Sequence, residues 1–128
     1  MVVDSSAIIA ILLSEPDAQL FAECIGRQSI AVISAASYVE VAIVARSRGQ
    51  IGRNLVDATL DKVGIVIVPV SAELARGAAD AFATYGRGRH PAKLNYGDCF
   101  AYALAKQRRE PLLFKGDDFS RTDLVAAL

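Results

Sequence analysis

The sequence predicts a single α/β domain with three layers, in which helices cover both faces of a central parallel sheet of four to five short strands. The chain has 128 residues, which fits one hydrophobic core. Apolar runs of three to five residues alternate with longer stretches of helical character. None of these runs alternates apolar with polar residues, and strands that are apolar on both faces are typical of parallel sheets covered by helices.

The first elements are bounded by clear local signals. A strand over 2–4 opens the chain, and the two serines that follow are favoured caps for a helix over 5–14. Pro16 suits the first turn of a second helix, over 16–27, and the β-branched run at 30–33 predicts the second strand. The remaining elements continue this alternation, as helices over 34–49, 51–63, 71–85 and 97–109 and strands over 65–68 and 112–114.

Composition excludes several classes of protein. Hydrophobic residues make up 53% of the chain, so we expect a partner to bury part of the surface. No apolar run approaches the ~20 residues of a membrane span, and the short apolar stretch 7–13 follows Asp4 instead of a basic segment, unlike a secretion signal. Cys24 and Cys99 are too few for a disulfide scaffold and lack the spacing of metal ligands. We therefore expect a cytoplasmic protein with reduced thiols.

The zero net charge hides a basic segment. Residues 85–115 carry seven cations and two anions, a net charge of +5, and the stretch 87–93 has the glycines and proline of a loop. Its cations, Arg87, Arg89 and Lys93, would suit contacts with a nucleic-acid backbone. A solvated run of charge explains them as well, so charge alone leaves both explanations open.

Three carboxylates stand alone in segments that are otherwise built for burial. Asp4 is the only charged residue of 1–14, Glu40 of 28–45, and Asp98 of 94–105. Burying an ionised carboxylate without compensation costs several kcal/mol. Local explanations exist, since the two aspartates could cap helices and the glutamate could pair with an arginine, but one shared cause explains all three.

Topology supplies that cause. In open parallel sheets, ligands bind beyond the carboxyl ends of the strands, where Asp4, Glu40 and Asp98 can meet Asp117 and Asp118 that follow the last strand. Several carboxylates in one crevice repel each other unless a cation holds them ionised. Oxygen ligands without His or Cys suit Mg²⁺ or Mn²⁺. An acidic metal crevice beside a basic loop fits a phosphodiesterase.

Other kinds of site fit less well. The sequence has no phosphate-binding glycine loop, and the single histidine, His90, is better explained as a solvent-facing or phosphate-contacting residue than as a catalytic base. A phosphate-accepting receiver domain would need an aspartate at the end of its central strand, and 65–71 has none. A dehalogenase-type site would need Asp-x-Asp or Asp-x-Thr where this chain has Asp4-Ser-Ser.

Four motifs, in order and over nearly the whole chain, resemble the PIN-domain ribonucleases, and more narrowly the VapC-type toxins of toxin–antitoxin pairs. The motifs are Val-Val-Asp-Ser-Ser-Ala at 2–7, Ala-Ser-Tyr-Val-Glu-Val-Ala at 36–42, Leu-Asn-Tyr-Gly-Asp-Cys-Phe-Ala-Tyr-Ala-Leu-Ala at 94–105 and Leu-Leu-Phe-Lys-Gly-Asp-Asp-Phe at 112–119.

The resemblance implies a single PIN domain over 1–128 that acts as a metal-dependent endoribonuclease. It implies an acidic site of Asp4, Glu40 and Asp98, with Asp4 and Asp98 as the metal ligands. Asp117 would be the fourth acid, although the adjacent Asp118 could take its place. Ser6 matches a hydroxyl position that orients Asp4 or a bound water. One or two Mg²⁺ or Mn²⁺ ions would activate a water for in-line attack on RNA.

The resemblance also implies partners. A VapB-like antitoxin would cover the site, with a helix in the groove between the first helices, and the chain would form a homodimer. The alternative is a catalytically silent PIN-like module that binds RNA or a partner without cutting.

Overall fold

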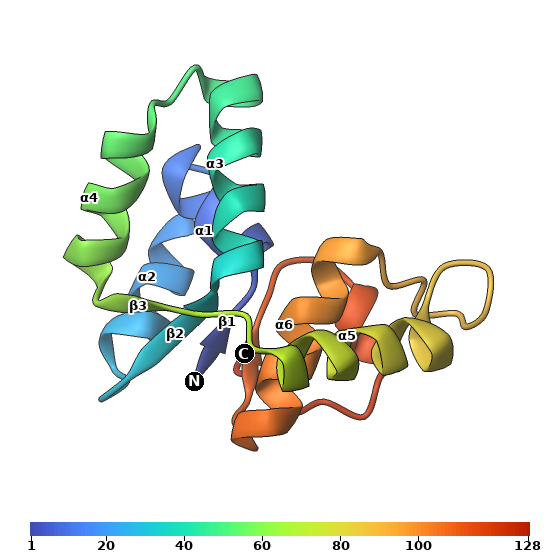
Figure 1. The fold of residues 1–128 in the computed structure, drawn as a ribbon. Coiled ribbons are helices and arrows are strands. Elements are labelled where there is room, and N and C mark those ends of the chain that lie inside the picture. The colour runs from blue at the N-terminus through green and yellow to red at the C-terminus, as the bar shows by residue number, and fades with distance from the viewer.

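The computed structural model describes all 128 residues and has four strands and six α-helices in the expected alternation (Figure 1). Every predicted element is present, with ends shifted by at most two residues. The elements are β1 (Val2–Val3), α1 (Ser5–Leu12), α2 (Ala18–Gly26), β2 (Ala31–Ser34), α3 (Ala35–Gly49), α4 (Arg53–Val63), β3 (Ile65–Val68), α5 (Ala72–Tyr85), α6 (Tyr96–Arg108), β4 (Leu112–Leu113) and a 3₁₀ turn, η1 (Asp118–Arg121).

The four strands form one parallel sheet in the order β3-β2-β1-β4. Strand β1 pairs with β2 on one side and with β4 on the other, and its Val2 lies opposite Val32 of β2 and Leu112 of β4. All four strands therefore end at the same edge of the sheet, and the residues that follow them are brought together there.

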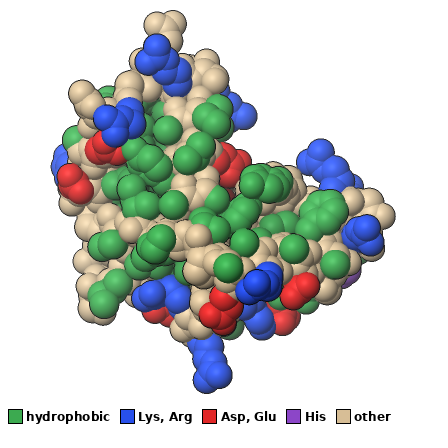
Figure 2. Space-filling model, in the orientation of Figure 1, with side chains coloured by type: hydrophobic (Ala, Val, Ile, Leu, Met, Phe, Trp, Pro, Cys, Tyr) green, Lys and Arg blue, Asp and Glu red, His purple; other side chains and the backbone are tan.

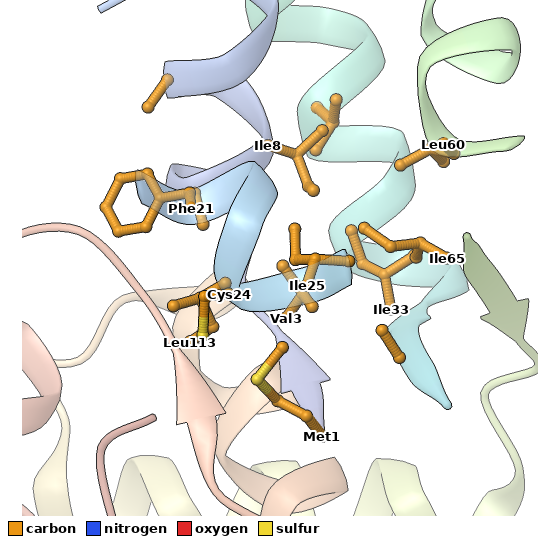
Figure 3. Close-up of a cluster of buried hydrophobic side chains, with 14 of the residues drawn as sticks. Met1, Val3, Ile8, Phe21, Cys24, Ile25, Ile33, Leu60, Ile65 and Leu113 are labelled. Atoms are coloured by element: carbon orange, nitrogen blue, oxygen red, sulfur yellow. The ribbon is translucent and has the colours of Figure 1, made fainter. Parts of the chain in front are cut away.

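Two hydrophobic clusters, one on each face of the sheet, confirm the three-layer architecture. Val3, Ile33 and Ile65 face the layer of α1 to α4, where Ile8, Ile25 and Leu60 complete the first cluster (Figure 3). On the opposite face, Val2, Val32 and Leu112 pack against α5 and α6. Neighbouring residues of each strand thus face different layers, as period-two geometry requires.

The edge strand β3 departs from the expectation that helices cover both faces of every strand. Val66 is 56% exposed and Ile67 41% exposed, although both are strongly apolar. Val66 lies on the face of α5 and α6, which pack over β1, β2 and β4 and leave the outer part of β3 uncovered (Figure 1). Ile67 lies on the opposite face, toward the layer of α1 to α4, and is exposed at the same edge of the sheet.

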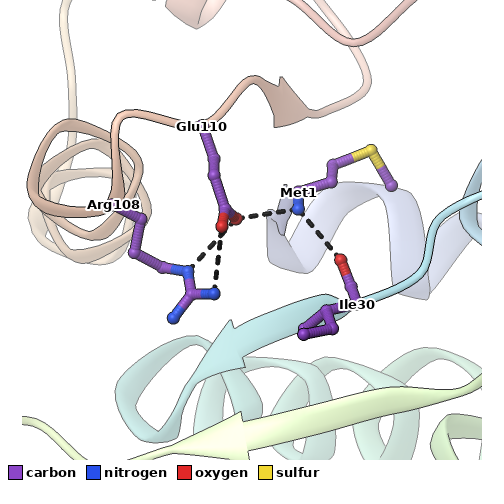
Figure 4. A network of polar contacts seen from close by, with 4 residues as sticks. All are labelled: Met1, Ile30, Arg108 and Glu110. Carbon is purple, nitrogen blue, oxygen red and sulfur yellow. Dashed lines mark hydrogen bonds and ion pairs between the residues drawn. The ribbon is translucent and has the colours of Figure 1, made fainter.

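An ionic network joins the start of β1 to the connection between α6 and β4 (Figure 4). The α-amino group of Met1 donates to the carbonyl oxygen of Ile30 at 3.0 Å and lies 2.7 Å from the Glu110 carboxylate. Arg108 donates two hydrogen bonds to the same carboxylate, at 3.0 and 3.1 Å, and is the main reason that the pKa of Glu110 lies below its usual value. The network therefore holds the start of β1 close to the end of α6.

Each helix of the structure is too short or too polar to cross a lipid bilayer.

Candidate active site

A cleft of about 350 Å³ opens where the strands end, between α1, α3 and the start of α6. The molecule has two arms, one formed by α1 to α4 and the other by α5 and α6 (Figure 1). Figure 2 shows acidic side chains at the bottom of the hollow between these two arms, with Lys and Arg side chains toward the outer ends of the arms. The acids that line the cleft are Glu15, Asp4, Glu40, Asp98 and Asp118. The structure therefore brings the three lone carboxylates of the sequence into one site.

Asp4 is held by the first turn of α1, directly after β1. It is the N-cap of that helix, and its Oδ2 accepts hydrogen bonds from the backbone N–H of Ser6 at 2.9 Å and from the Ser6 hydroxyl at 2.6 Å. The Ser6 hydroxyl oxygen accepts in turn from the N–H of Lys115, at 2.9 Å, beyond the end of β4. Oδ2 is thus fixed by capping, while the buried Oδ1 has no hydrogen-bond partner.

Asp98 is held in the same way by the first turn of α6. Its Oδ2 accepts from the N–H of Asn95 at 2.7 Å, and the Asn95 side chain accepts from the N–H of Asp98 at 2.9 Å, which forms a capping box. Asp98 is 7% exposed. Burial and the neighbouring charges of Asp4, Asp118 and Glu40 raise its pKa to about 7, even though the Asn95 hydrogen bond acts in the opposite direction.

Glu40 reaches the cleft from the second turn of α3. Its buried Oε2 has no hydrogen-bond partner and lies against the backbone of Gly97, where a Cβ atom would collide with the carboxylate. Glycine at this position therefore allows α6 to approach α3. Burial and the charge of Asp4 raise the pKa of Glu40, and the nearby Ser5 hydroxyl partly offsets the effect.

The electrostatics of the cleft favour a cation. Burial, above all, raises the pKa of Asp4, and the charge of Asp118 adds to the effect. Two carboxylate oxygens, on Asp4 and Glu40, are buried without a partner, which is costly unless a ligand satisfies them. A divalent cation together with its bound waters would supply both the positive charge and partners for these two oxygens.

The donor set fits a hard cation that keeps part of its water. No three acidic, histidine or cysteine side chains lie close enough to form a ready-made metal cage. Mg²⁺ is commonly bound through one or two carboxylates, with waters completing its coordination, whereas zinc favours His and Cys ligands. The cleft holds Asp, Glu, Asn and Ser side chains, which suit the first kind of ion.

The two aspartates after β4 differ in position. Asp118 lines the cleft, and its charge raises the pKa of Asp4 and of Asp98. Asp117 is exposed, does not line the cleft and lies at the start of η1, where it makes no capping hydrogen bond with its side chain. The 3₁₀ turn thus directs the second aspartate of the pair, and not the first, toward the site.

The basic residues near the cleft are not the ones that sequence reasoning selected. Arg87, Arg89 and Lys93 are exposed on the loop between α5 and α6 and do not line the cleft, whereas Arg48 and Lys115 do. Lys115 pairs with Glu15 at 2.7 Å and with Asp17 at 3.1 Å. The helical spacing Glu40, Val44, Arg48 on α3 was the signal that could have identified the arginine.

His90, expected to face solvent or to contact a phosphate, also has a structural position within the basic loop. Its ring is half-buried and meets Tyr85 edge-on, with ring centroids 4.9 Å apart, and its Nδ1 accepts from the N–H of Ala92 at 3.1 Å. It therefore holds the basic loop in shape. Cys24 and Cys99 are both free, as expected, and the structure places both of them in buried positions.

Comparisons with known proteins find relatives over nearly the whole chain. The model of the PIN domain family matches residues 1–125. The chain is 48% identical over 127 residues to Ribonuclease VapC of Mycolicibacterium smegmatis, covering 98% of each protein. It is 47% identical over 126 residues to Ribonuclease VapC30 of Mycobacterium tuberculosis, covering 98% of this chain and 96% of that protein.

Two solved structures have the same fold at low sequence identity. VapC20 of Mycobacterium tuberculosis, described as a toxin that cleaves the sarcin–ricin loop, gives a TM-score of 0.75 at 14% identity, over 97% of this chain and 95% of that one. A toxin–antitoxin complex from Klebsiella pneumoniae gives a TM-score of 0.74 at 19% identity, over 99% and 97%.

Proposed function

Because this chain belongs to the PIN-domain family, among the VapC ribonucleases, we propose that it is the endoribonuclease toxin of a VapBC-like toxin–antitoxin pair. The observation that carries the proposal is the convergence of Asp4, Glu40 and Asp98 in one cleft, with two unpartnered carboxylate oxygens among them. A purely structural set of acids would be hydrogen-bonded or paired with cations.

We assign a divalent cation, Mg²⁺ or Mn²⁺, to Asp4 and Asp98. When bound, the cation lowers the pKa of a coordinated water and offsets charge on the phosphate. The chain's own part is to orient the ligands: Ser6 holds one oxygen of Asp4 and Asn95 holds one oxygen of Asp98, so that a single oxygen of each is left for the ion.

Glu40 and Asp118 complete the acidic site in this proposal. The raised pKa of Glu40 suits it to accept a proton at Oε2 from the water that attacks the phosphorus. The position of Asp118 on the cleft supports it as the fourth acid in place of Asp117, which the sequence motif favoured.

The RNA backbone would lie across the mouth of the cleft. Arg48 lines the cleft and belongs to none of the ion pairs of the chain, so its guanidinium is free to contact a phosphate. The exposed cations Arg87, Arg89 and Lys93, which directly precede the start of α6, would contact the backbone further along the strand.

Partner proteins would cover the exposed apolar side chains. Leu20, Val39, Ile43 and Leu55 on α2, α3 and α4 are each more than half exposed, and we propose that they receive a helix of a VapB-like antitoxin. The uncovered side chains of β3, Val66 and Ile67, are available to a second copy in a homodimer. Free thiols fit a reducing compartment, so we place the pair in the cytoplasm.

A cleavage assay tests this function. The purified chain, denatured and refolded alone to remove any bound inhibitor, is incubated with total RNA in Mg²⁺, Mn²⁺ or EDTA, beside the variants Asp98→Asn and Asp61→Asn. Asp61 is an exposed acid of α4 outside the cleft and serves as the matched control. We expect discrete fragments only with a divalent cation and only from wild type and Asp61→Asn. RNA binding without cleavage under all these conditions would favour the silent module.

A further inference from the structure

An apolar pocket lies between α5 and α6, next to the acidic cleft. It measures about 440 Å³, and every residue that lines it is hydrophobic: alanines of α5 on one side, and Phe82, Tyr96, Cys99 and Phe100 around the rest. Neither the metal site nor the antitoxin surface proposed above uses this pocket.

Aromatic rings stand exposed at its rim. Tyr96 is 80% exposed, and its ring meets that of Phe100 edge-on, with centroids 5.1 Å apart. Phe82 is 38% exposed, and the guanidinium of Arg89 lies over its ring, 5.9 Å from the centroid. A flat aromatic surface bordered by a guanidinium is the combination with which proteins stack unpaired nucleobases.

The first turn of α6 connects this pocket to the cleft. Tyr96 and Cys99, three residues apart, face the pocket, while Asn95 and Asp98, also three residues apart, face the cleft. The two cavities therefore lie on adjacent sides of a single helical turn, which rises only about 5.4 Å. In Figure 2, apolar side chains adjoin the acidic hollow on the wall of one arm.

Charge at the rim also matches a nucleic acid. The basic loop that carries Arg87, Arg89 and Lys93 runs from the end of α5 to the start of α6, the two helices that form the pocket. Phosphates that flank a base in the pocket would meet these cations. A purely apolar partner would gain nothing from them.

We propose that the α5–α6 pocket binds one unpaired nucleobase of the RNA substrate, next to the phosphate that is cleaved, with Tyr96 as the stacking platform. This rests on the ribonuclease function proposed above and adds to it a binding site for one base of the substrate. Bases in a duplex are already stacked on each other, so the substrate must be single-stranded at this position, as in a loop or an unfolded message.

Binding is measured by fluorescence anisotropy with a labelled 12-nucleotide single-stranded RNA of mixed sequence, in the non-cleaving Asp98→Asn background. Stacking on an aromatic ring contributes about 5- to 150-fold in affinity per base. We expect Tyr96→Ala to weaken binding at least five-fold, Tyr96→Phe to retain it, and Val125→Ala, a change at an exposed apolar residue outside the pocket, to have no effect. Replacing one nucleotide of the RNA at a time by an abasic one should reveal a single position at which Tyr96→Ala no longer lowers the affinity, because the base that stacks on Tyr96 is already missing.

Each result separates the pocket from the catalytic function. If the wild-type chain cleaves RNA and Tyr96→Ala cleaves the same sites with the same kcat/KM, the pocket proposal is wrong and the ribonuclease stands. If Tyr96→Ala instead changes the oligomeric state in sedimentation and leaves RNA affinity intact, the face is an interface between copies and the proposal is again wrong. If the wild type does not cleave and Asp98→Asn binds no RNA, both proposals fall.

Discussion

Replacing Asp98 by asparagine should abolish cleavage and, in the absence of metal, stabilise the fold in a pH-dependent way. The pKa of Asp98 is raised from 3.8 to about 7 in the folded chain because the carboxyl group is buried among other acids. A raised pKa means that the folded state holds the proton more tightly than the unfolded state. Well below pH 3.8 the group is neutral in both states, so the aspartate costs nothing. The cost grows between pH 4 and 7 and is complete above pH 7.

The shift sets the size of the effect. A shift of three pKa units corresponds to about 4 kcal/mol, at about 1.4 kcal/mol per unit. This is an upper limit, because water in the open cleft screens part of the charge. Asparagine has the same shape, stays neutral at every pH and can still accept the hydrogen bond from Asn95. At pH 8 in EDTA, we therefore expect the variant to exceed wild type in free energy of unfolding by about 1–3 kcal/mol, and by no more than about 0.5 kcal/mol at pH 4.

Urea denaturation followed by circular dichroism measures this difference, since the chain has no tryptophan for fluorescence. The stability of Asp98→Asn relative to wild type should rise by up to about 1.4 kcal/mol per pH unit between pH 4 and 7. Asp61→Asn, the exposed control on α4, should show no such slope. A difference that does not change with pH, or a variant less stable than wild type at pH 8, would refute the electrostatic explanation of the cleft.

Four further substitutions, two of them compared with each other, test the geometry of the site. In the RNA cleavage assay, Asp118→Asn should lower kcat at least ten-fold, because Asp118 lines the cleft, while Asp117→Asn should stay within two-fold of wild type. The reverse ranking would show that Asp117 is the fourth acid, as the sequence motif suggests. Gly97→Ala should reduce cleavage, because the added Cβ displaces the carboxylate of Glu40, even though alanine stabilises a helix by about 0.5–1 kcal/mol relative to glycine. Unchanged cleavage with improved thermal stability would show that the contact between Gly97 and Glu40 is unimportant. Ser6→Ala removes a hydroxyl that donates a hydrogen bond to Asp4 and accepts one from Lys115. We therefore expect the metal affinity measured by calorimetry to fall 10- to 100-fold and the free energy of unfolding to fall by about 1–2 kcal/mol. An unchanged metal titration would argue against an orienting role of Ser6.

The architecture could be predicted from the sequence because local signals and burial agree. The run 65–68 is β-branched and bounded by Gly64 and Pro69, and the structure has β3 at the same residues. The first strand ends one residue before the predicted end, because the side chain of Asp4 caps α1. From the sequence alone, helix capping and a shared acidic site are alternative explanations of Asp4 and Asp98. The structure shows both together, since capping fixes one oxygen and leaves the other for the cleft.

The parts of the site that sequence reasoning missed or left open depend on tertiary geometry. Asp117 and Asp118 are neighbours in sequence, and only the turn after Gly116, whose φ of +95° few other residues adopt, decides which of them faces the cleft. The basic loop is adjacent to α6 in sequence, but its direction could not be predicted, and Arg48 lines the cleft in its place. The aromatic pocket forms where α5 and α6 pack together, and no local sequence pattern predicts that these two helices are in contact.

The products of cleavage test the central claim most directly, namely that the acids of the cleft hold a divalent cation for hydrolysis of RNA by water. One defined RNA is treated with the refolded chain in Mg²⁺ or EDTA, and the new ends are analysed by mass spectrometry. The account predicts fragments only with Mg²⁺, each new junction bearing one ordinary phosphate and one hydroxyl, because the attacking oxygen belongs to water. Fragments that form in EDTA and end in a 2′,3′-cyclic phosphate would show attack by the RNA's own 2′-hydroxyl and would contradict it.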